Sequence, residues 1–190
     1  MKLRFFGIFS ALGLAIVAAA TIAFAATSPT IESTPIPGPP KPDFSAMKFL
    51  LGNWTCSTKS SRRPSAYTTT STASIDPTGY WMVTKSVQHK TSWVPQDLSA
   101  TDMTTYDADA HRWVDVLTGD WGGYNVSTSP GWHGISMVWT DAVISPQGNV
   151  ASTTPTIVTK VSDTKTTARN TFKEKSGRTI TVDTVCKKTS

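Results

Sequence analysis

The side chains that could carry out catalysis or hold a metal are scattered along this sequence. The three histidines, His89, His111 and His133, lie far apart, whereas a recognisable metal site needs two ligands at short spacing. Ser162 and Lys165 match the S-x-x-K spacing, but they lie in a polar turn between predicted strands, whereas that pair acts from the start of a helix. The sequence therefore predicts no metal, no cofactor and no catalytic residue.

The aspartates form no evident acid–base pair. Most of them lie at predicted turns, where aspartate caps backbone N–H groups: Asp97, Asp102, Asp107, Asp109, Asp115, Asp120 and Asp141. An isomerase or hydrolase with a buried acid remains a third hypothesis, which requires two titratable groups to converge in one cavity.

Aromatic side chains offer a different chemistry, the binding of an apolar or planar molecule. The chain has seven tryptophans, which either line a ligand pocket or fill the core of a small domain. Trp139 is the best pocket candidate, because it shares the inward face of a predicted strand with His133, Ile135 and Met137. The full set of predicted ligand-binding residues is Trp81, Tyr124, His133, Met137 and Trp139.

The elements that would position these residues are short β-strands. Turn signals such as Asp76-Pro77-Thr78-Gly79 and Ser129-Pro130-Gly131 recur between runs of β-branched and aromatic residues, which is typical of an all-β meander. The predicted strands are 49–59, 66–75, 80–89, 101–106, 111–118, 121–128, 132–141, 155–162, 165–173 and 177–187. A short helix is expected around 42–47. An antiparallel up-and-down β-barrel of roughly 8–10 strands is favoured over a β-sandwich.

The two cysteines favour the barrel. Cys56 shares a face with Gly52 and Trp54 on the first predicted strand, and Cys186 shares a face with Ile180 and Val182 on the last. A Cys56–Cys186 disulfide would make these strands neighbours, as barrel closure requires, although a sandwich can also carry an inter-sheet disulfide. The bridge would span roughly 130 residues and stabilise the fold by about 4 to 5 kcal/mol in the loop-entropy model.

The segment FLLGNW, residues 49–54, resembles the G-x-W signature that begins the first strand of lipocalin-like (calycin) barrels. The segment YDADAHRWVDVLTGDWGGYNVSTSPGWHG and the ending TVDTVCKK are similar to exported bacterial lipocalin-like domains of unassigned function, and the resemblance covers most of residues 47–188. It implies structural roles for Gly52 and for Trp54, which would fill the closed end of the barrel beneath a basic residue of the last strand.

Lys188 is the candidate for that basic residue. If Cys56 lies opposite Cys186 in an antiparallel pair, Trp54 faces Lys188. The related nitrobindin barrels bind haem through a histidine on a late strand, but this chain has no histidine after His133, so the resemblance implies no haem site.

The N-terminal region predicts export. Residues 1–25 resemble a cleaved signal peptide, with Lys2 and Arg4, an apolar run and the ending Ala23-Phe24-Ala25; an uncleaved membrane anchor is the rival interpretation. Residues 26–43 form a proline-rich linker, and residues 44–190 form the lipocalin-like domain. Loss of Lys2 and Arg4 lowers the net charge from +5 to +3, which gives little support for binding nucleic acid.

The leading interpretation is a secreted or periplasmic protein that binds a small apolar ligand in the mouth of the barrel. The alternative is a structural or interaction module of the cell envelope, whose barrel is filled by its own side chains and holds no ligand. A monomer or weak dimer, without stable membrane insertion after signal cleavage, is expected in either case.

Overall fold

The structure is a computed structural model that describes residues 38–144 and 149–189. The predicted signal peptide and linker residues 26–37 lie outside the described residues. Pro39–Ser190 belongs to one unit of the chain, and everything below concerns that unit. Within residues 38–144 and 149–189, no helix has the length and apolar character needed to cross a membrane.

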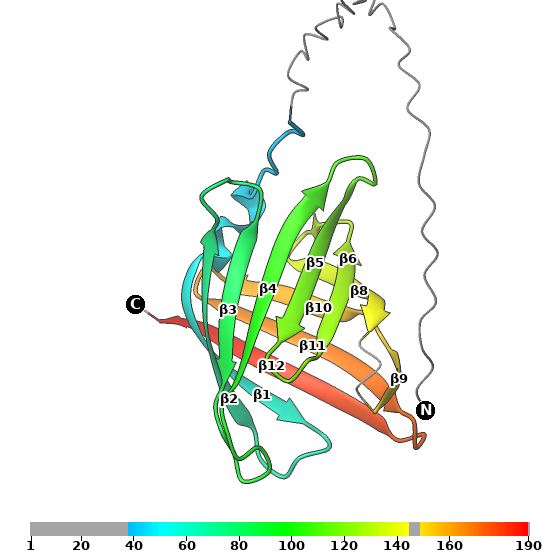
Figure 1. Cartoon of the computed structure of the whole chain (residues 1–190). Helices are drawn as coiled ribbons and strands as arrows, with labels where there is room; N and C mark the ends of the chain where they lie inside the picture. Colours follow the sequence, from blue (N-terminus) through cyan, green and yellow to red (C-terminus); the bar gives the residue numbers. More distant parts are fainter. Residues whose placement is uncertain (1–37, 145–148, 190) are drawn as a thin grey trace, which may run out of the picture. The chain divides into compact units, whose positions relative to one another are not determined.

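The described residues form one short helix and a series of antiparallel strands (Figure 1). The elements are the 3₁₀-helix η1 (Ser45–Leu50), β1 (Gly52–Ser60), β2 (Tyr67–Ile75), β3 (Met82–Gln88), β4 (Leu98–Asp107), β5 (Arg112–Gly119), β6 (Tyr124–Ser129), β7 (Trp132–His133), β8 (Ser136–Ile144), β9 (Val150–Thr153), β10 (Thr156–Ser162), β11 (Lys165–Glu174) and β12 (Thr179–Thr189).

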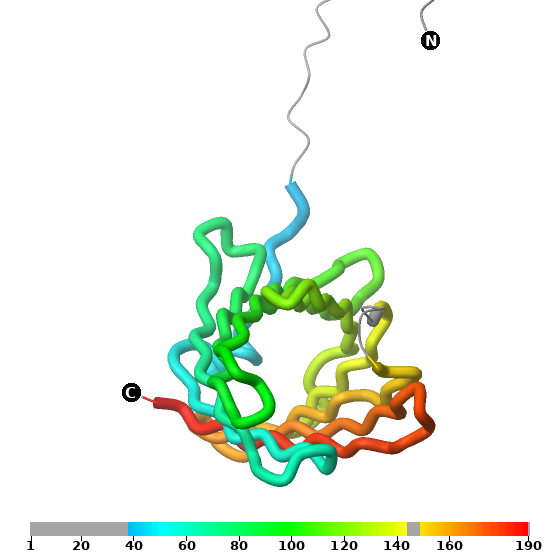
Figure 2. The backbone as a smooth tube through the Cα atoms, turned by 60° about the horizontal axis from the view of Figure 1, so that its bottom comes forward, coloured from blue at the N-terminus to red at the C-terminus, as the bar shows by residue number. Residues whose placement is uncertain are grey.

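Ten of these strands close into a barrel. The order β10-β11-β12-β1-β2-β3-β4-β5-β6-β8 is completed by pairing of β8 with β10, while β7 pairs only with β8 and β9 pairs with β11. Seen from near its end, the backbone runs as a closed ring (Figure 2). The predicted all-β antiparallel barrel is therefore confirmed, and the sandwich alternative is wrong.

The ring closes where β1 meets β12, because the inward residues of the two strands pair across the seam. Cys56 lies directly opposite Cys186 and is disulfide-bonded to it. Two residues further along, the hydroxyls of Thr58 and Thr184 lie 3.0 Å apart and form a hydrogen bond.

One end of the barrel is covered by η1. The indole Nε1 of Trp54 donates a hydrogen bond to Leu50 O at 2.7 Å. Lys188, opposite Trp54 on β12, donates from Nζ to Phe49 O at 2.9 Å and lies 5.6 Å from the centroid of the Trp54 ring. Gly52 has φ +105°, and a Cβ at this position would lie 3.3 Å from Lys188 Cε, so glycine suits both the backbone and the close approach of the lysine.

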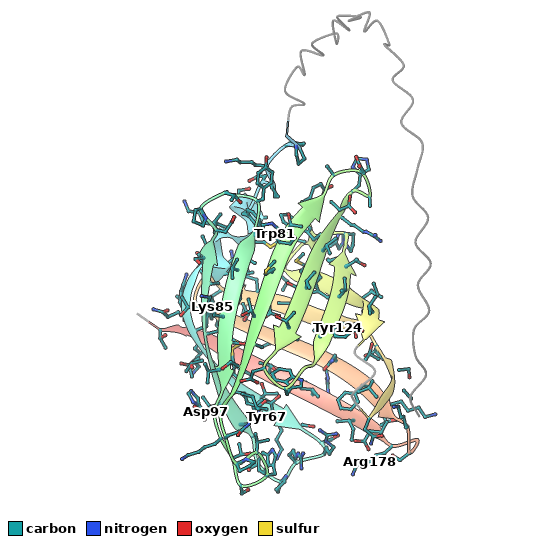
Figure 3. The ribbon with its side chains drawn as sticks, in the orientation of Figure 1. Tyr67, Trp81, Lys85, Asp97, Tyr124 and Arg178 are labelled. Atoms are coloured by element: carbon teal, nitrogen blue, oxygen red, sulfur yellow. A yellow bond between two sulfur atoms is a disulfide. The ribbon has the colours of Figure 1, made fainter. Side chains whose placement is uncertain are left out.

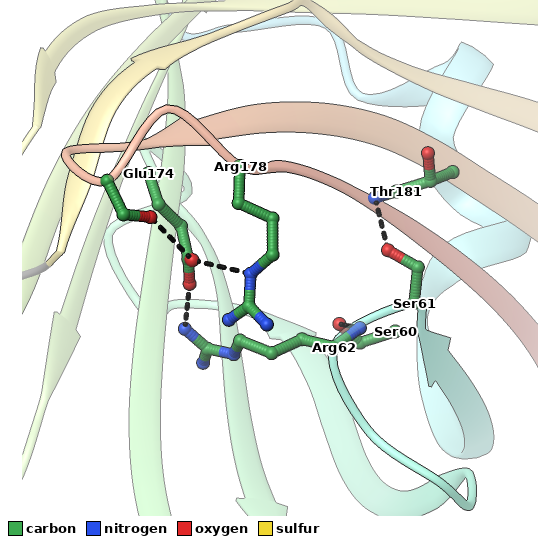
Figure 4. A network of polar contacts seen from close by, with 7 residues as sticks. Ser60, Ser61, Arg62, Glu174, Arg178 and Thr181 are labelled. Atoms are coloured by element: carbon green, nitrogen blue, oxygen red, sulfur yellow. Dashed lines mark hydrogen bonds and ion pairs between the residues drawn. The ribbon is translucent and has the colours of Figure 1, made fainter.

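Away from η1, an ion-pair cluster around the buried Glu174 joins the loop after β1 to the β11–β12 hairpin (Figure 4). Arg62 Nη1 donates to Glu174 Oε1 at 3.0 Å, and Arg178 Nε donates to Glu174 Oε2 at 2.8 Å. The Glu174 side chain is only 3% exposed. Hydrogen bonds from Arg178 and then Arg62 lower the pKa of Glu174 to about 2, so the carboxylate is fully paired.

The predicted continuous strand 132–141 is wrong. Gly134 has φ +60° and lies in a turn between β7 and β8, so the chain reverses after His133 and the alternation restarts at Ser136. Ile135 is consequently 64% exposed, and His133 is exposed as well. The expected helix at 42–47 begins slightly later, as η1 (Ser45–Leu50).

Candidate functional site: the barrel interior

A cavity of about 450 Å³ lies inside the barrel beside η1. Its walls come from η1 and from the inner faces of seven strands and the β7 hairpin residue Trp132. The volume falls within the range typical of small-molecule sites in proteins. The interior is therefore only partly filled by the protein's own side chains.

The wall nearest η1 is apolar. Met47 of η1, Met82 of β3 and Met137 of β8 are buried and form one hydrophobic cluster with Trp113. Trp132 and Trp139 pack against this cluster. These side chains form a surface suited to an aromatic or aliphatic group, and methionine adapts readily to the shape of such a group.

Polar side chains also line the cavity, and strand register explains how they are brought together. Asp115 on β5 lies opposite Thr104 on β4 and Ser127 on β6, and Ser127 in turn lies opposite Asp141 on β8. Asp102 lies two residues before Thr104, on the same face of β4. Three carboxyl groups therefore line one cavity, and within residues 38–144 and 149–189 no lysine, arginine or histidine lines it.

Burial changes the proton affinity of two of these acids. It raises the pKa of Asp102 to about 7, with a smaller contribution from the negative charge of Asp115. Burial also raises the pKa of Asp115, although a hydrogen bond from Thr104 Oγ1 at 2.6 Å opposes the shift. Near neutral pH, Asp102 therefore exchanges between its acid and carboxylate forms.

Asp141 has a different environment, because neutral donors surround its carboxylate. Its Oδ1 accepts hydrogen bonds from Asn125 Nδ2 at 2.8 Å and from Ser127 Oγ at 3.1 Å, and its Oδ2 accepts one from Thr153 Oγ1 at 2.6 Å. Asn125 is thereby held with its Oδ1 buried and without a partner among the described residues. The indole Nε1 of Trp132 is likewise buried and unpartnered in the part of the chain that the structure describes. Such atoms are costly to bury unpaired.

Two of the five predicted ligand-binding residues line the cavity. Met137 is only 1% exposed, and both it and Trp139 face the interior from β8. Tyr124 is 44% exposed, because it alternates with the cavity-lining Asn125 on β6. His133 is exposed on the short β7, so the expectation that it faces inward is wrong.

Trp81 also lies outside the cavity. It directly precedes the inward-facing Met82 and lines a separate surface pocket of about 650 Å³ with Tyr80, Tyr106 and residues of the predicted linker. Tyr80 there donates a hydrogen bond from its hydroxyl to Pro39 O at 2.8 Å. Figure 3 labels Trp81 and Tyr124 on different parts of the barrel wall.

Sequence reasoning missed Trp132 and the three interior aspartates. A signal for Asp115 was present, because it alternates with Trp113 and Leu117 in the segment Trp113-Val114-Asp115-Val116-Leu117. That spacing places the acid on the face that buries the tryptophan. Among the residues that the structure describes, no group of three or more histidine, cysteine, aspartate or glutamate side chains is arranged to hold a metal ion.

No protein-family model matches the chain, and no curated protein matches it. Among solved structures, it is similar to a protein of unknown function from the DUF3598 family of Nostoc punctiforme, with 15% sequence identity and a TM-score of 0.36. The match covers 75% of this chain and 48% of that protein, so this chain spans about half the length of its structural neighbour.

Proposed function

We propose that this protein binds a small molecule non-covalently inside a lipocalin-like barrel. The observation that supports this function best is the cavity of about 450 Å³, which is lined by both apolar and polar side chains. A bound molecule would place its apolar part against Trp132, Trp139 and Met137 and its polar part against the aspartates. The ligand predicted from the sequence, a largely apolar one, is thereby revised to a molecule with two distinct ends.

The alternative function, a structural module with a filled barrel, requires an interior without space for a ligand. The cavity volume argues against that requirement. The buried polar atoms of Asn125 and Trp132, which lack partners among the described residues, also favour an occupant that can hydrogen-bond.

Asp102 and Asp115 meet the condition set for the enzymatic hypothesis, since both line the same cavity. Non-covalent binding is still the better-supported function. Among the lining residues that the structure describes, aspartates are the only titratable side chains, and neither cysteine, histidine nor lysine is present there to act as a nucleophile or as a complementary base.

The proposed site of action is outside the cytoplasm, after cleavage of the signal peptide 1–25. The Cys56–Cys186 disulfide is compatible with an exported protein.

Isothermal titration of the mature protein with naphthylmethanol, a neutral molecule with an aromatic body and one polar group, tests this function. Val158→Trp fills the cavity from β10, whereas Ile157→Trp places the same side chain on the outer face of that strand, where Ile157 is 47% exposed. We expect binding by the wild type and Ile157→Trp, and at least a ten-fold loss in Val158→Trp. The function would be refuted if the wild-type protein bound none of naphthylmethanol, naphthylmethylamine and naphthoate. Undiminished binding by Val158→Trp would refute it as well. Thr84→Phe fills the cavity from β3 and serves if Val158→Trp does not fold.

A further inference from the structure

We propose that the ligand of the barrel cavity is an organic cation, a protonated amine attached to an aromatic or aliphatic body, which binds with its charge among Asp102, Asp115 and Asp141. This inference rests on the proposed function, because it identifies the chemical class of ligand for the same cavity.

Charge balance favours a cation. The three aspartates come from β4, β5 and β8 and line one cavity, and its described lining residues include no basic side chain. Glu174 provides the contrast within the same barrel, since two arginines pair with this buried carboxylate (Figure 4). Partly buried carboxylates without a basic partner are less favourable than paired ones, so the complementary positive charge in the cavity is assigned to the ligand.

The second argument is the balance of hydrogen-bond donors and acceptors. Within the described residues, Asp102 accepts no side-chain hydrogen bond, Asp115 accepts one from Thr104, and the buried Oδ1 of Asn125 accepts none. Among these carboxylate and amide groups, acceptors therefore outnumber donors, while the unpartnered Nε1 of Trp132 is a donor. A protonated primary amine brings three N–H donors and no acceptor, which complements the carboxylates and the Oδ1 of Asn125. A carboxylate or phosphate ligand would add acceptors and repel the aspartates.

The spacing of the apolar and acidic lining residues also fits such a molecule. Trp139 and Asp141 lie two positions apart on β8, which separates them by about 7 Å along the strand. A ligand whose aromatic ring packs beside Trp139 and Met137, and whose amine is attached to that ring through one or two bonds, spans the distance from Trp139 to Asp141. Asp115 on β5 likewise lies two residues from Trp113, which belongs to the hydrophobic cluster but is not among the cavity-lining residues.

Proton linkage adds a dependence that can be measured. The titratable groups facing Asp102 across the cavity are Asp115 and Asp141 alone, among the lining residues. Since the pKa of Asp102 is raised to about 7, this group is largely protonated at about pH 6 and largely ionised at about pH 8. An amine that stays protonated over this range should bind more tightly at the higher pH.

Isothermal titration with three compounds of matched shape tests the inference: naphthylmethylamine, naphthylmethanol and naphthoate. At about pH 8 we expect the amine to bind at least ten-fold more tightly than the alcohol, with no detectable binding of naphthoate. Asp102→Asn and Asp115→Asn should each weaken amine binding about ten-fold and weaken alcohol binding by a clearly smaller factor, because only the amine loses a charge–charge interaction. Asp183→Asn, on the outer side of β12 and paired with Arg169, is the charge-matched control and should bind the amine as the wild type does.

The outcomes separate the two proposals. If the alcohol binds as tightly as the amine, or if neither cavity variant affects the amine, the cation assignment is overturned and the proposed binding function stands. If none of the three compounds binds, both proposals fail. Displacement of the amine by calcium chloride at unchanged ionic strength would overturn the assignment in favour of a metal ion, and amine affinity that does not rise from about pH 6 to about pH 8 would contradict the role of Asp102.

Discussion

At Asp102, the ionised carboxylate that would bind the proposed ligand is also the form that is unfavourable for folding. A carboxyl group in the barrel wall loses its hydration, and a second acid, Asp115, lies on the neighbouring strand. Folding raises the pKa of Asp102 from 3.8 to about 7, so ionising it inside the barrel reduces stability. The contribution of protonated Asp102 to the free energy of unfolding is greatest below 3.8, its pKa in the unfolded chain. This contribution decreases as the pH rises towards about 7, its pKa in the folded protein.

Asp102→Asn should therefore remove a pH-dependent cost. About three pKa units correspond to about 4 kcal/mol of unfolding free energy, which accumulates between about pH 4 and about pH 8. Urea denaturation across this range should show wild-type stability falling relative to Asp102→Asn as pH rises. Parallel pH curves for the two proteins would contradict the burial of Asp102, and Asp183→Asn controls for loss of one charge at the surface.

The candidate site was only partly predictable at this scale. Alternation correctly placed Met137 and Trp139 on an inner face, because that rule depends only on strand geometry. The alternation rule failed for His133, because the turn at Gly134 separates β7 from β8, so the alternation of inward and outward side chains does not continue from Met137 back to His133. The interior aspartates resemble turn aspartates in sequence, and only the paired neighbours on adjacent strands reveal that they line one cavity.

At the scale of elements, Lys188 joins the last strand to the helix that covers the barrel. Its ammonium group binds Phe49 O of η1 and lies over the ring of Trp54 on β1. Three elements distant in sequence therefore meet at one side chain. The cavity wall contributed by Met47 and Leu50 depends on η1 keeping this position.

Lys188→Met keeps most of the side-chain length but removes the charge and its hydrogen bond. We expect the free energy of unfolding to fall by about 1 to 2 kcal/mol, measured by thermal or urea denaturation. Lys187→Met is the matched control, because Lys187 is exposed on the outer face of β12. Equal stabilities of the two variants would show that the contact contributes nothing.

Strand positions were easier to predict than connections. The first and last strands follow from β-branched periodicity and the cysteine positions, and both were located to within a few residues. The β7–β8 hairpin and the short β9 were missed, since a two-residue strand carries almost no periodic signal.

At the scale of the whole molecule, closure determines whether there is an interior at all. The first and last strands of the chain, β1 and β12, pair with each other and close the barrel. The Cys56–Cys186 bond between them links residues 130 positions apart. The backbone pairing from Asn53 to Ser60 along β12 also holds this seam. The disulfide thus reinforces a junction that hydrogen bonds already form.

The double variant Cys56→Ala/Cys186→Ala should keep the barrel but lose stability. The loop-entropy model gives a decrease of about 4 to 5 kcal/mol in unfolding free energy. Urea denaturation of the oxidised wild type and the variant measures the difference, with far-UV circular dichroism to check that the strands remain. Equal midpoints would mean that the seam is held by strand pairing alone.

The closed barrel could be predicted because several signals agreed: strand-length periodicity, inward faces on both terminal strands and one pair of cysteines. The cavity could not, since its volume depends on how side chains from seven strands and η1 fill the same space. Composition offered seven tryptophans as candidates to fill the interior, yet Trp81 and the 48%-exposed Trp121 lie outside it.

The most direct test of the central claim is a crystal structure of the mature protein soaked with a bromine-labelled naphthylmethylamine. The account predicts one anomalous bromine peak inside the barrel, beside Trp139 and Met137, with the amine directed towards Asp102 and Asp115. A barrel interior filled by its own side chains, or bromine peaks confined to the outer surface, would contradict it.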